Sequence, residues 1–350
     1  MADDRRQGID ERTFVRRVLI ILALILLFLL AWQLRTLLLM LFGAVVVATV
    51  FRALAGRIGR LTRLSESVAV ATAIILILGI VGVFMFLFGT EVAQQLDILR
   101  ETLPAAWLSF EQRVGDLGLG DQLQRLAEGV RESSGSFANL SRAVMSIGNG
   151  IAEVLVVLFG GIYLAAQPRV YKSGAIKLVP AAKRGLVAEA MDESETALRL
   201  WLRGQLIAMI VVGLLTGTGL WLLGMPSALV LGLAAGILEF IPFVGPFLAA
   251  VPAILLALAV SPDLALWVIL LYVVVQQIEG YVLTPLVQQY AVELPGVILL
   301  FSLIGFGIVF GTLGVILAAP LTVVSYVLVK RLYVIETLHT ATPIPGEDKT

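Results

Sequence analysis

Long apolar runs separated by short polar stretches dominate this chain, and they predict an all-α polytopic membrane protein. A charged leader at residues 1–17 precedes two short spans at residues 18–34 and 37–51, with one bent helix over both as the alternative. A basic loop at residues 52–67 leads to a third span at residues 68–88. The first run lacks a small-residue cleavage site, which favours a retained span over a signal peptide. We expect the spans of residues 18–88 to act as a scaffold.

Residues 89–146 break this pattern, because apolar positions recur there at roughly helical spacing among many charged residues. The spacing predicts amphipathic helices in a small extracytoplasmic segment. Residues 147–204 then combine a fourth span at 147–166 with a cytoplasmic basic stretch that ends in a polar helix at 186–203. That helix leads into a fifth span at residues 205–223.

The apolar stretch at residues 226–260 cannot be one straight helix. Pro242 lacks a backbone N–H donor, and Gly245 and Pro246 follow it within about one turn. We predict a hairpin of two short helices, about 226–240 and 247–260, whose bend is shaped by Pro242, Gly245 and Pro246. Irregular backbone inside a membrane is tolerated where protein or a water-filled cavity satisfies it, and broken helices are typical of the transport sites of secondary transporters.

A second interrupted segment, at residues 296–329, follows a span at 265–283 and a polar linker at 284–295. The sequence GPFLAA that begins at Gly245 recurs as GVILAA beginning at Gly314, an offset of 69 residues. The bends of this second hairpin are expected at Gly311, Gly314 and Pro320.

The two hairpins predict an internal repeat. Because each hairpin follows one span, the two units would have opposite orientations, as in the inverted repeats of many secondary transporters. Chance similarity between Leu-, Ala- and Gly-rich helices is the alternative. The repeat implies about eight membrane segments, a transport unit at residues 205–331 and a cytoplasmic tail at residues 332–350.

Composition and charge agree with this class. Hydrophobic residues make up 59% of the chain and charged residues 14%. The formal net charge is zero, which gives no reason to expect a nucleic-acid partner, and there is no cysteine. With the N-terminus inside, 19 of the 25 Lys and Arg residues fall on the cytoplasmic side. The positive-inside rule therefore predicts an inner-membrane protein with both termini in the cytoplasm.

Three glutamates, Glu153, Glu239 and Glu279, fall within apolar segments that hold no basic residue deep enough to pair with them. An ionised side chain at the bilayer centre costs about 2.5–3.5 kcal/mol on insertion scales. Each glutamate should therefore be protonated, or should face water or a bound cation. Proton coupling, cation coupling and hydrogen bonding to a polar solute are all compatible with such a group.

Glu239 is the strongest site candidate because it adjoins the predicted bend, and a structural role in bonding the amides of the bend is the alternative. Glu279 has Gln276 and Gln277 close by, and its alternative is a carboxylate that reaches the interface. Glu153 is better explained by an interfacial position. We expect Glu239, Glu279, Gln276, Gln277 and Gln205, which opens the fifth span, to bind substrate or ion.

Catalysis has little support in the sequence. No P-loop motif occurs, no metal-ligand cluster occurs, and the single histidine, His339, lies in the polar tail. We expect no enzyme activity, no cofactor and no metal centre.

Several motifs resemble those of the AI-2E (autoinducer-2 exporter, or PerM-like permease) family of prokaryotic membrane proteins. The stretch LGLAAGILEFIPFVGPFLAAVPA at residues 231–253 carries the most specific similarity, with an E-x-I-P-x-x-G-P core from Glu239 to Pro246. The motif WLRGQ that ends at Gln205, the motif QIEG that begins at Gln277 and the motif FGTLGVILAAP that ends at Pro320 add to it. The resemblance covers nearly the whole chain.

The resemblance implies a carrier with two re-entrant-like hairpins, an elevator-like movement and a homo-oligomer, expected to be a pentamer. Some members are similar to exporters of the quorum-sensing signal autoinducer-2, and others are similar to sodium (lithium)/proton antiporters. The leading hypothesis is ion-coupled export of a small polar solute such as autoinducer-2, in contact with the lipid bilayer. A cation/proton antiporter is the first alternative, and a non-transporting membrane scaffold is the second.

Overall fold

The computed structural model describes residues 11–86, 89–90, 152–283 and 294–343, and every regular element in these ranges is helical. The predicted all-α class is confirmed for them. Six of the described helices are long and apolar enough to cross a membrane. A seventh candidate is the helix at residues 152–166 together with α6 (Pro168–Lys177), which meet at a bend of 94°. The predicted extracytoplasmic segment and nearly all of the polar linker lie outside the described residues.

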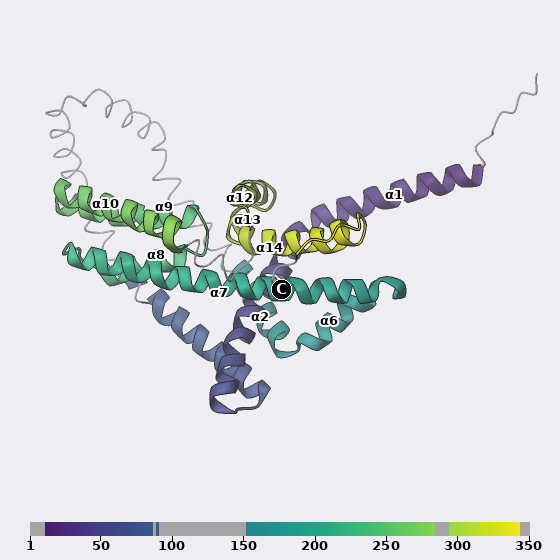
Figure 1. Cartoon of the computed structure of the whole chain (residues 1–350), viewed down its shortest axis with the longest axis horizontal. Helices are drawn as coiled ribbons and strands as arrows, with labels where there is room; N and C mark the ends of the chain where they lie inside the picture. The colour runs from purple at the N-terminus through teal and green to yellow at the C-terminus, as the bar shows by residue number, and fades with distance from the viewer. Residues whose placement is uncertain (1–10, 87–88, 91–151, 284–293, 344–350) are drawn as a thin grey trace, which may run out of the picture.

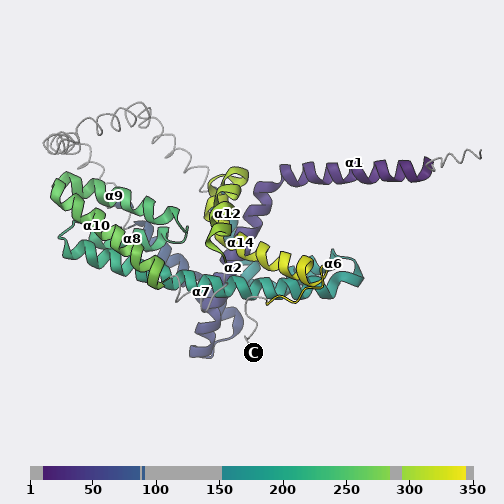
Figure 2. The ribbon, with the colours of Figure 1, turned by 45° about the horizontal axis from the view of Figure 1, so that its top comes forward.

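Helix α7 (Arg184–Leu222) is the longest of the described elements, and helices from both halves of the chain contact it (Figure 1). Its 39 residues join the predicted polar helix to the fifth span without a break. One part of α7 packs on α2 (Arg35–Thr62) and α14 (Ala318–Val329), and the other part packs on α8 (Ala228–Leu238). Both views place α14 and the helices from α8 to α10 toward opposite ends of α7 (Figure 2).

The core is divided in the same way. Near the N-terminal half of α7, one apolar cluster joins α2, α7 and α14 through Leu39, Leu198, Trp201, Val323 and Val327. Near its C-terminal end, another cluster joins α7 to α8, α9 (Val244–Val260) and α10 (Pro262–Ile278) through Leu220, Leu231, Ala257 and Val268. Helix α7 is therefore the one long element shared by both clusters.

The first two spans are separate helices, since α1 (Glu11–Gln33) ends and α2 begins on either side of Leu34. The apolar part of α1 has no buried residue, and both views show this helix projecting from the rest of the chain (Figures 1 and 2). The predicted basic loop at residues 52–67 is wrong over most of its length. Helix α2 continues to Thr62 because arginine is a good helix former, and a left-handed Arg63 ends it.

The predicted hairpin at residues 226–260 is broken as expected, with α8 ending at Leu238 and α9 starting at Val244. The predicted start of the second helix at residue 247 is wrong, since Gly245 and Pro246 already lie in the first turn of α9. A proline is tolerated there because the first N–H groups of a helix have no intrahelical partner.

The second interrupted segment contains three helices. These are α12 (Gly296–Phe310), α13 (Thr312–Ile316) and α14, with breaks at Gly311 and Leu317. Gly311 has a positive φ of 68°, a conformation that favours glycine. Pro320 lies in the first turn of α14, where its missing N–H is again tolerated.

Candidate functional site

Glu239 lies at the C-terminal end of α8, where the hairpin breaks, and only 2% of its surface is exposed. The backbone turns sharply after it: the N–H of Ile241 donates to the carbonyl of Leu238 at 2.9 Å, and Pro242 cannot continue the helical ladder. Phe243 then adopts a positive φ of 65° before α9 begins. A non-glycine residue in this region of φ is strained, and such strain is often found at functional sites.

Gly245 allows the two helices to meet this closely. A Cβ atom added at Gly245 would lie 1.9 Å from the carbonyl oxygen of Leu238, a contact that no side chain can make. The residue type at position 245 is thus set by the close approach of the start of α9 to the end of α8.

Two side chains of α7 hold the bend. The Nε2 group of Gln205 donates a hydrogen bond to the backbone carbonyl of Glu239 at 2.6 Å. The ring of Trp201, one turn earlier on α7, meets the ring of Phe240 edge-on, with centroids 5.9 Å apart. Helix α7 therefore holds the bend at two neighbouring residues, Glu239 and Phe240.

Glu279 approaches Glu239 from α10. It begins a π-helical turn, η2 (Glu279–Leu283), and such turns are frequent at functional sites. Packing of Val275 and Leu283 against Val212 of α7 brings this end of α10 to the bend. The carboxyl group of Glu279 comes close enough to that of Glu239 for the two to interact electrostatically. Nε2 of Gln276 donates a hydrogen bond to Oε2 of Glu279 at 2.8 Å.

The site thus contains a carboxyl pair with no positive charge beside it. Among the described residues, neither Glu239 nor Glu279 forms an ion pair with Lys or Arg. Among those residues, the buried Oε2 atom of Glu239 has no hydrogen-bond partner. Such a pair can take up a proton or a cation, or can accept hydrogen bonds from a polar solute.

The structure brings together Glu239, Glu279, Gln276 and Gln205, four of the five residues that the sequence suggested as binding residues. Gln277 is exposed and has no described contact with the pair. Glu153 is half-buried on the helix at residues 152–166, which packs on α2 and not on the hairpin.

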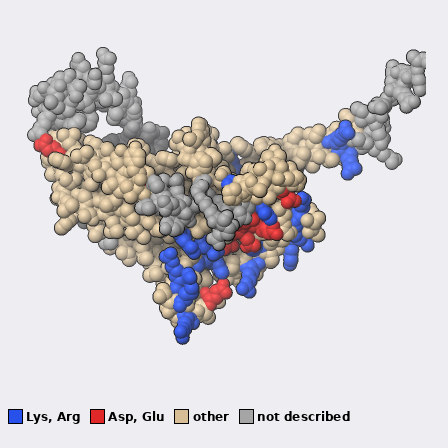
Figure 3. Space-filling model, in the orientation of Figure 1, with Lys and Arg blue, Asp and Glu red and all other residues tan. Residues whose placement is uncertain are grey.

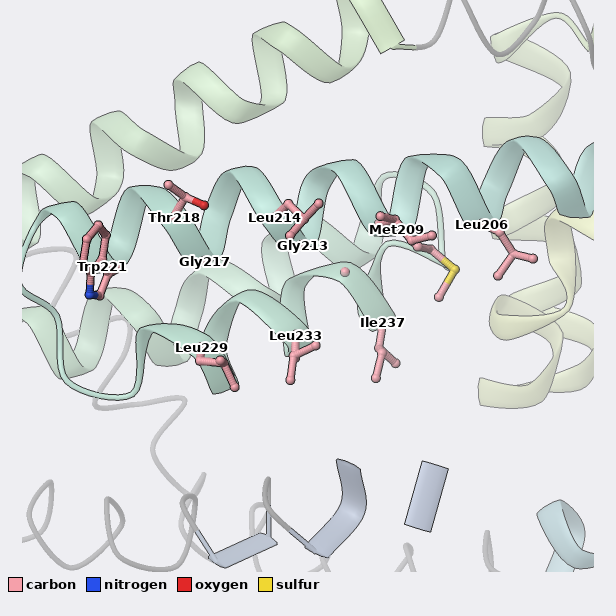
Figure 4. A pocket seen from close by; sticks show the side chains of 12 residues that line it. Leu206, Met209, Gly213, Leu214, Gly217, Thr218, Trp221, Leu229, Leu233 and Ile237 are labelled. Atoms are coloured by element: carbon pink, nitrogen blue, oxygen red, sulfur yellow. The ribbon is translucent and has the colours of Figure 1, made fainter. Parts of the chain in front are cut away.

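The seam between α7 and α8 was not recognised from the sequence. Gly213 and Gly217 of α7 face Gly232 and Gly236 of α8, and a Cβ at Gly232 would lie 2.4 Å from the Cα of Gly217. The signal was present as two G-x-x-x-G motifs, which let helix backbones approach closely in membranes. Beside the seam lies an apolar groove of about 580 Å³ (Figure 4), lined among others by Leu206, Met209, Trp221, Leu229 and Leu233.

Comparisons with known proteins agree on one family. The sequence profile described as AI-2E family transporter matches residues 19–333. The chain is 27% identical over 254 residues to "Putative transport protein YrrI" of Bacillus subtilis. This match covers 71% of this chain and 72% of that protein. It is 22% identical over 258 residues to "AI-2 transport protein TqsA" of Escherichia coli, covering 73% of this chain and 72% of that protein. It is 25% identical over 189 residues to a "Putative transport protein" of Thermotoga maritima, and this match covers 54% of this chain and 58% of that protein.

These names are those of transporters and not of enzymes. The match includes most of the described helices, among them the broken hairpin and the long apolar helices that make this an integral membrane protein. The chain belongs to the AI-2E family of transporters.

Proposed function

We propose that this protein is a secondary transporter that exports a small polar solute such as autoinducer-2, and that export is coupled to an ion. The observation that carries the proposal is the buried Glu239 at the break of an apolar hairpin, close to Glu279. Unpaired acids within apolar segments are costly and mark solute or ion pathways in membrane proteins. The name of the relative TqsA, an AI-2 transport protein, supports the choice of solute.

The binding residues are Glu239, Glu279, Gln205, Gln276 and Gln277. The first four meet around the bend, where carboxyl and amide groups can form hydrogen bonds with the hydroxyl and carbonyl groups of a polar solute. Gln277 follows Gln276 on the exposed side of α10 and would contact the solute on its way to the bend.

The two hairpins form an inverted repeat that surrounds the translocation path. Gly245 and Gly314, equivalent under the 69-residue offset, make the same kind of contact. A Cβ at Gly245 would lie 1.9 Å from the carbonyl oxygen of Leu238, and one at Gly314 would lie 2.1 Å from that of Phe306. A residue of positive φ, Phe243 or Gly311, also precedes the second helix of each unit. These matching contacts favour a common origin of the two hairpins over a chance similarity caused by their shared composition.

The protein lies in the inner membrane with both termini in the cytoplasm. Many Lys and Arg side chains gather over the end of α2 and around α6, and a separate group lies at the outer end of α1 (Figure 3). The first group supports a cytoplasmic position for its side of the molecule. Residues 89–146 then form the extracytoplasmic segment. The unit at residues 205–331 moves in an elevator-like manner against the N-terminal scaffold of a homo-oligomer, with a pentamer as the expected state. The fully exposed apolar surface of α1 supports such an assembly.

A sodium (lithium)/proton antiporter is a second candidate, favoured by the absence of a basic partner for the two glutamates among the described residues. Purified protein in proteoliposomes tests both functions. Autoinducer-2 efflux and proton movement would be measured under proton, sodium and lithium gradients, for the wild type, Glu239→Gln and the control Glu153→Gln.

Efflux of autoinducer-2 that is lost only in Glu239→Gln supports the exporter. Proton movement that responds to sodium or lithium, without solute efflux, supports the antiporter. If the folded oligomer produces no flux under any gradient, the chain is a scaffold and the proposal fails.

A further inference from the structure

The chain turns through nearly a right angle where the helix at residues 152–166 meets α6. The bend is 94°, and Nη1 of Arg52 on α2 donates to the carbonyl of Ala165 just before it, at 3.1 Å. This carbonyl is one of the last of its helix, which have no partner within the helix. The helix at residues 152–166 is apolar and packs on α2 and on the helix at residues 66–86. If it enters the membrane, its right-angled continuation α6 runs along the membrane surface.

Helix α6 is amphipathic, and its apolar face is turned outward. Val170, Tyr171 and Leu178 are 60%, 44% and 89% exposed. Leu178 follows the other two by eight and seven residues, about two helical turns, so the three side chains share one face. Lys172, on the other side of the helix, forms an ion pair with Asp192 of α7. A helix on the surface of a soluble protein has the opposite arrangement, with the apolar face toward the core.

The charge around α6 is complementary to an anionic membrane surface. Residues 167–188 contain five basic residues and no acidic residue, and Lys and Arg side chains surround α6 in the space-filling view (Figure 3). Lys177 and Lys172 border the apolar face on its two sides. A lysine in such a position can lay its stem on apolar surface and keep its ammonium group at the phosphates.

A tyrosine marks the same level of the membrane. Tyr163, in the last turn of the helix before the bend, is exposed, as is Tyr171 after it. Tyrosine is enriched where the hydrocarbon of a membrane meets the headgroups. The bend, the outward apolar face, the basic border and the two tyrosines together describe a helix that lies within the headgroup layer.

We propose that α6 is a membrane-surface anchor that binds anionic phospholipids, with Val170, Tyr171 and Leu178 against the acyl chains and Lys177 at the headgroup phosphates. The cytoplasmic leaflet attracts basic segments because it carries anionic lipids. The choice of this leaflet rests on the proposed orientation, whereas lipid binding by α6 does not rest on the transport function.

The anchor would also set the position of α7. Nε of Arg184, the first residue of α7, donates to the carbonyl of Val179 at 3.0 Å, directly after α6. The ion pair of Lys172 with Asp192 adds a second connection. Lipid binding at α6 therefore holds the cytoplasmic part of the helix that carries Gln205 to the hairpin bend.

Spin labels on the full-length protein in lipid nanodiscs test the position of α6. The chain contains no cysteine, so Leu178→Cys and Ser173→Cys each accept one nitroxide. Ser173 is exposed and lies five residues from Leu178, about 140° around the helix. We expect the label at position 178 to collide more often with oxygen, which concentrates in lipid, than with a water-soluble nickel complex. The label at position 173 should show the reverse preference.

A fluorophore on Leu178→Cys tests the choice of lipid. Nanodiscs would contain phosphatidylglycerol or phosphatidylcholine with brominated acyl chains, which quench a nearby fluorophore. We expect stronger quenching by phosphatidylglycerol, and a preference that falls about fivefold when Lys177→Gln removes one charge. Lys177→Arg is the matched control, because it keeps the charge and should keep the preference.

Three results would overturn the proposal. A label at position 178 that prefers the nickel complex would place the apolar face in water, and one shielded from both reagents would mean that protein covers it. Equal quenching by the two lipids, or an unchanged preference in Lys177→Gln, would rule out the headgroup site. These measurements need no transport, so the expected labelling and quenching without any flux would contradict the proposed function alone. Size-exclusion profiles that match the wild type confirm that each variant is folded.

Discussion

The side chains of Glu239 and Glu279 come close enough to interact electrostatically although one follows the end of α8 and the other begins the π-helical turn after α10. This proximity brings the bend of the hairpin to the end of the following span. The backbone of Glu239 is held at the same time by Gln205 of α7. Parts of three helices therefore come together at Glu239 in a largely apolar part of the chain, and substitutions there should affect both stability and transport.

Replacement of Gln205 by leucine tests the anchor on α7. The substitution removes the 2.6 Å hydrogen bond to the carbonyl of Glu239 and leaves that carbonyl without its donor. We expect the free energy of unfolding to fall by about 1 kcal/mol, as for a typical intramolecular hydrogen bond, and solute flux to decrease. Thermal unfolding in detergent measures the first effect and proteoliposome flux the second. Gln277→Leu, which alters an exposed amide, is the control for stability and should leave the melting temperature unchanged. An equal fall of the melting temperature in both variants would contradict a specific role for Gln205 as an anchor.

Gly245→Ala tests the close approach of α9 to α8. The new methyl group would lie 1.9 Å from a backbone carbonyl, so the start of α9 must move. Overpacking of this kind costs about 1–3 kcal/mol, and we expect a lower melting temperature and loss of flux. Gly305→Ala is the matched control, because a Cβ at Gly305 meets nothing within 4 Å. Gly314→Ala should lower the melting temperature as well, because a Cβ there would lie 2.1 Å from the carbonyl oxygen of Phe306.

Gly232→Ala tests the seam between α7 and α8. Apolar helices gain little from the hydrophobic effect in lipid, so their association depends on close packing of small residues. A Cβ at position 232 would lie 2.4 Å from the Cα of Gly217 and would force the helices apart. We expect a melting temperature clearly below that of the wild type. Gly79→Ala, in the helix at residues 66–86, adds a methyl group in open space and should have little effect. An unchanged melting temperature for Gly232→Ala would show that the seam is not tightly packed.

The sequence predicted the helical class, the broken hairpin and the position of Glu239 beside its break because each has a local signal: long apolar runs, closely spaced prolines, and an acid just before them. It did not predict that α2 would continue through Arg52, Arg57 and Arg60, since a run of arginines is equally compatible with a loop. It placed the start of α9 after Pro246, because a sequence does not show which proline falls in a first turn. The proximity of Glu239 to Glu279 depends on how α10 packs against α7, which no local pattern specifies.

Ion pairs between the end of the chain and α7 give the last prediction. Arg331, in the π-helical turn η3 (Lys330–Ile335), forms ion pairs with Glu189 and Glu193 of α7, and Lys183 lies 3.5 Å from Glu336. These pairs lie outside the apolar core, where a single ion pair contributes about 1 kcal/mol or less. Arg331 serves two carboxylates, so we expect Arg331→Ala to lower the melting temperature more than Glu189→Ala does.

A double-mutant cycle of Arg331→Ala and Glu189→Ala should give a coupling energy of about 0.5–1 kcal/mol. This coupling should shrink at high salt, because ions screen partly exposed charges. Arg57→Ala, which removes an exposed arginine of α2, is the control for loss of charge alone. Strict additivity of the two substitutions would mean that the contact contributes nothing to stability. Coupling that survives high salt would mean that the pairs are shielded from solvent, so that the C-terminal turn is fixed to α7 more firmly than its exposure suggests.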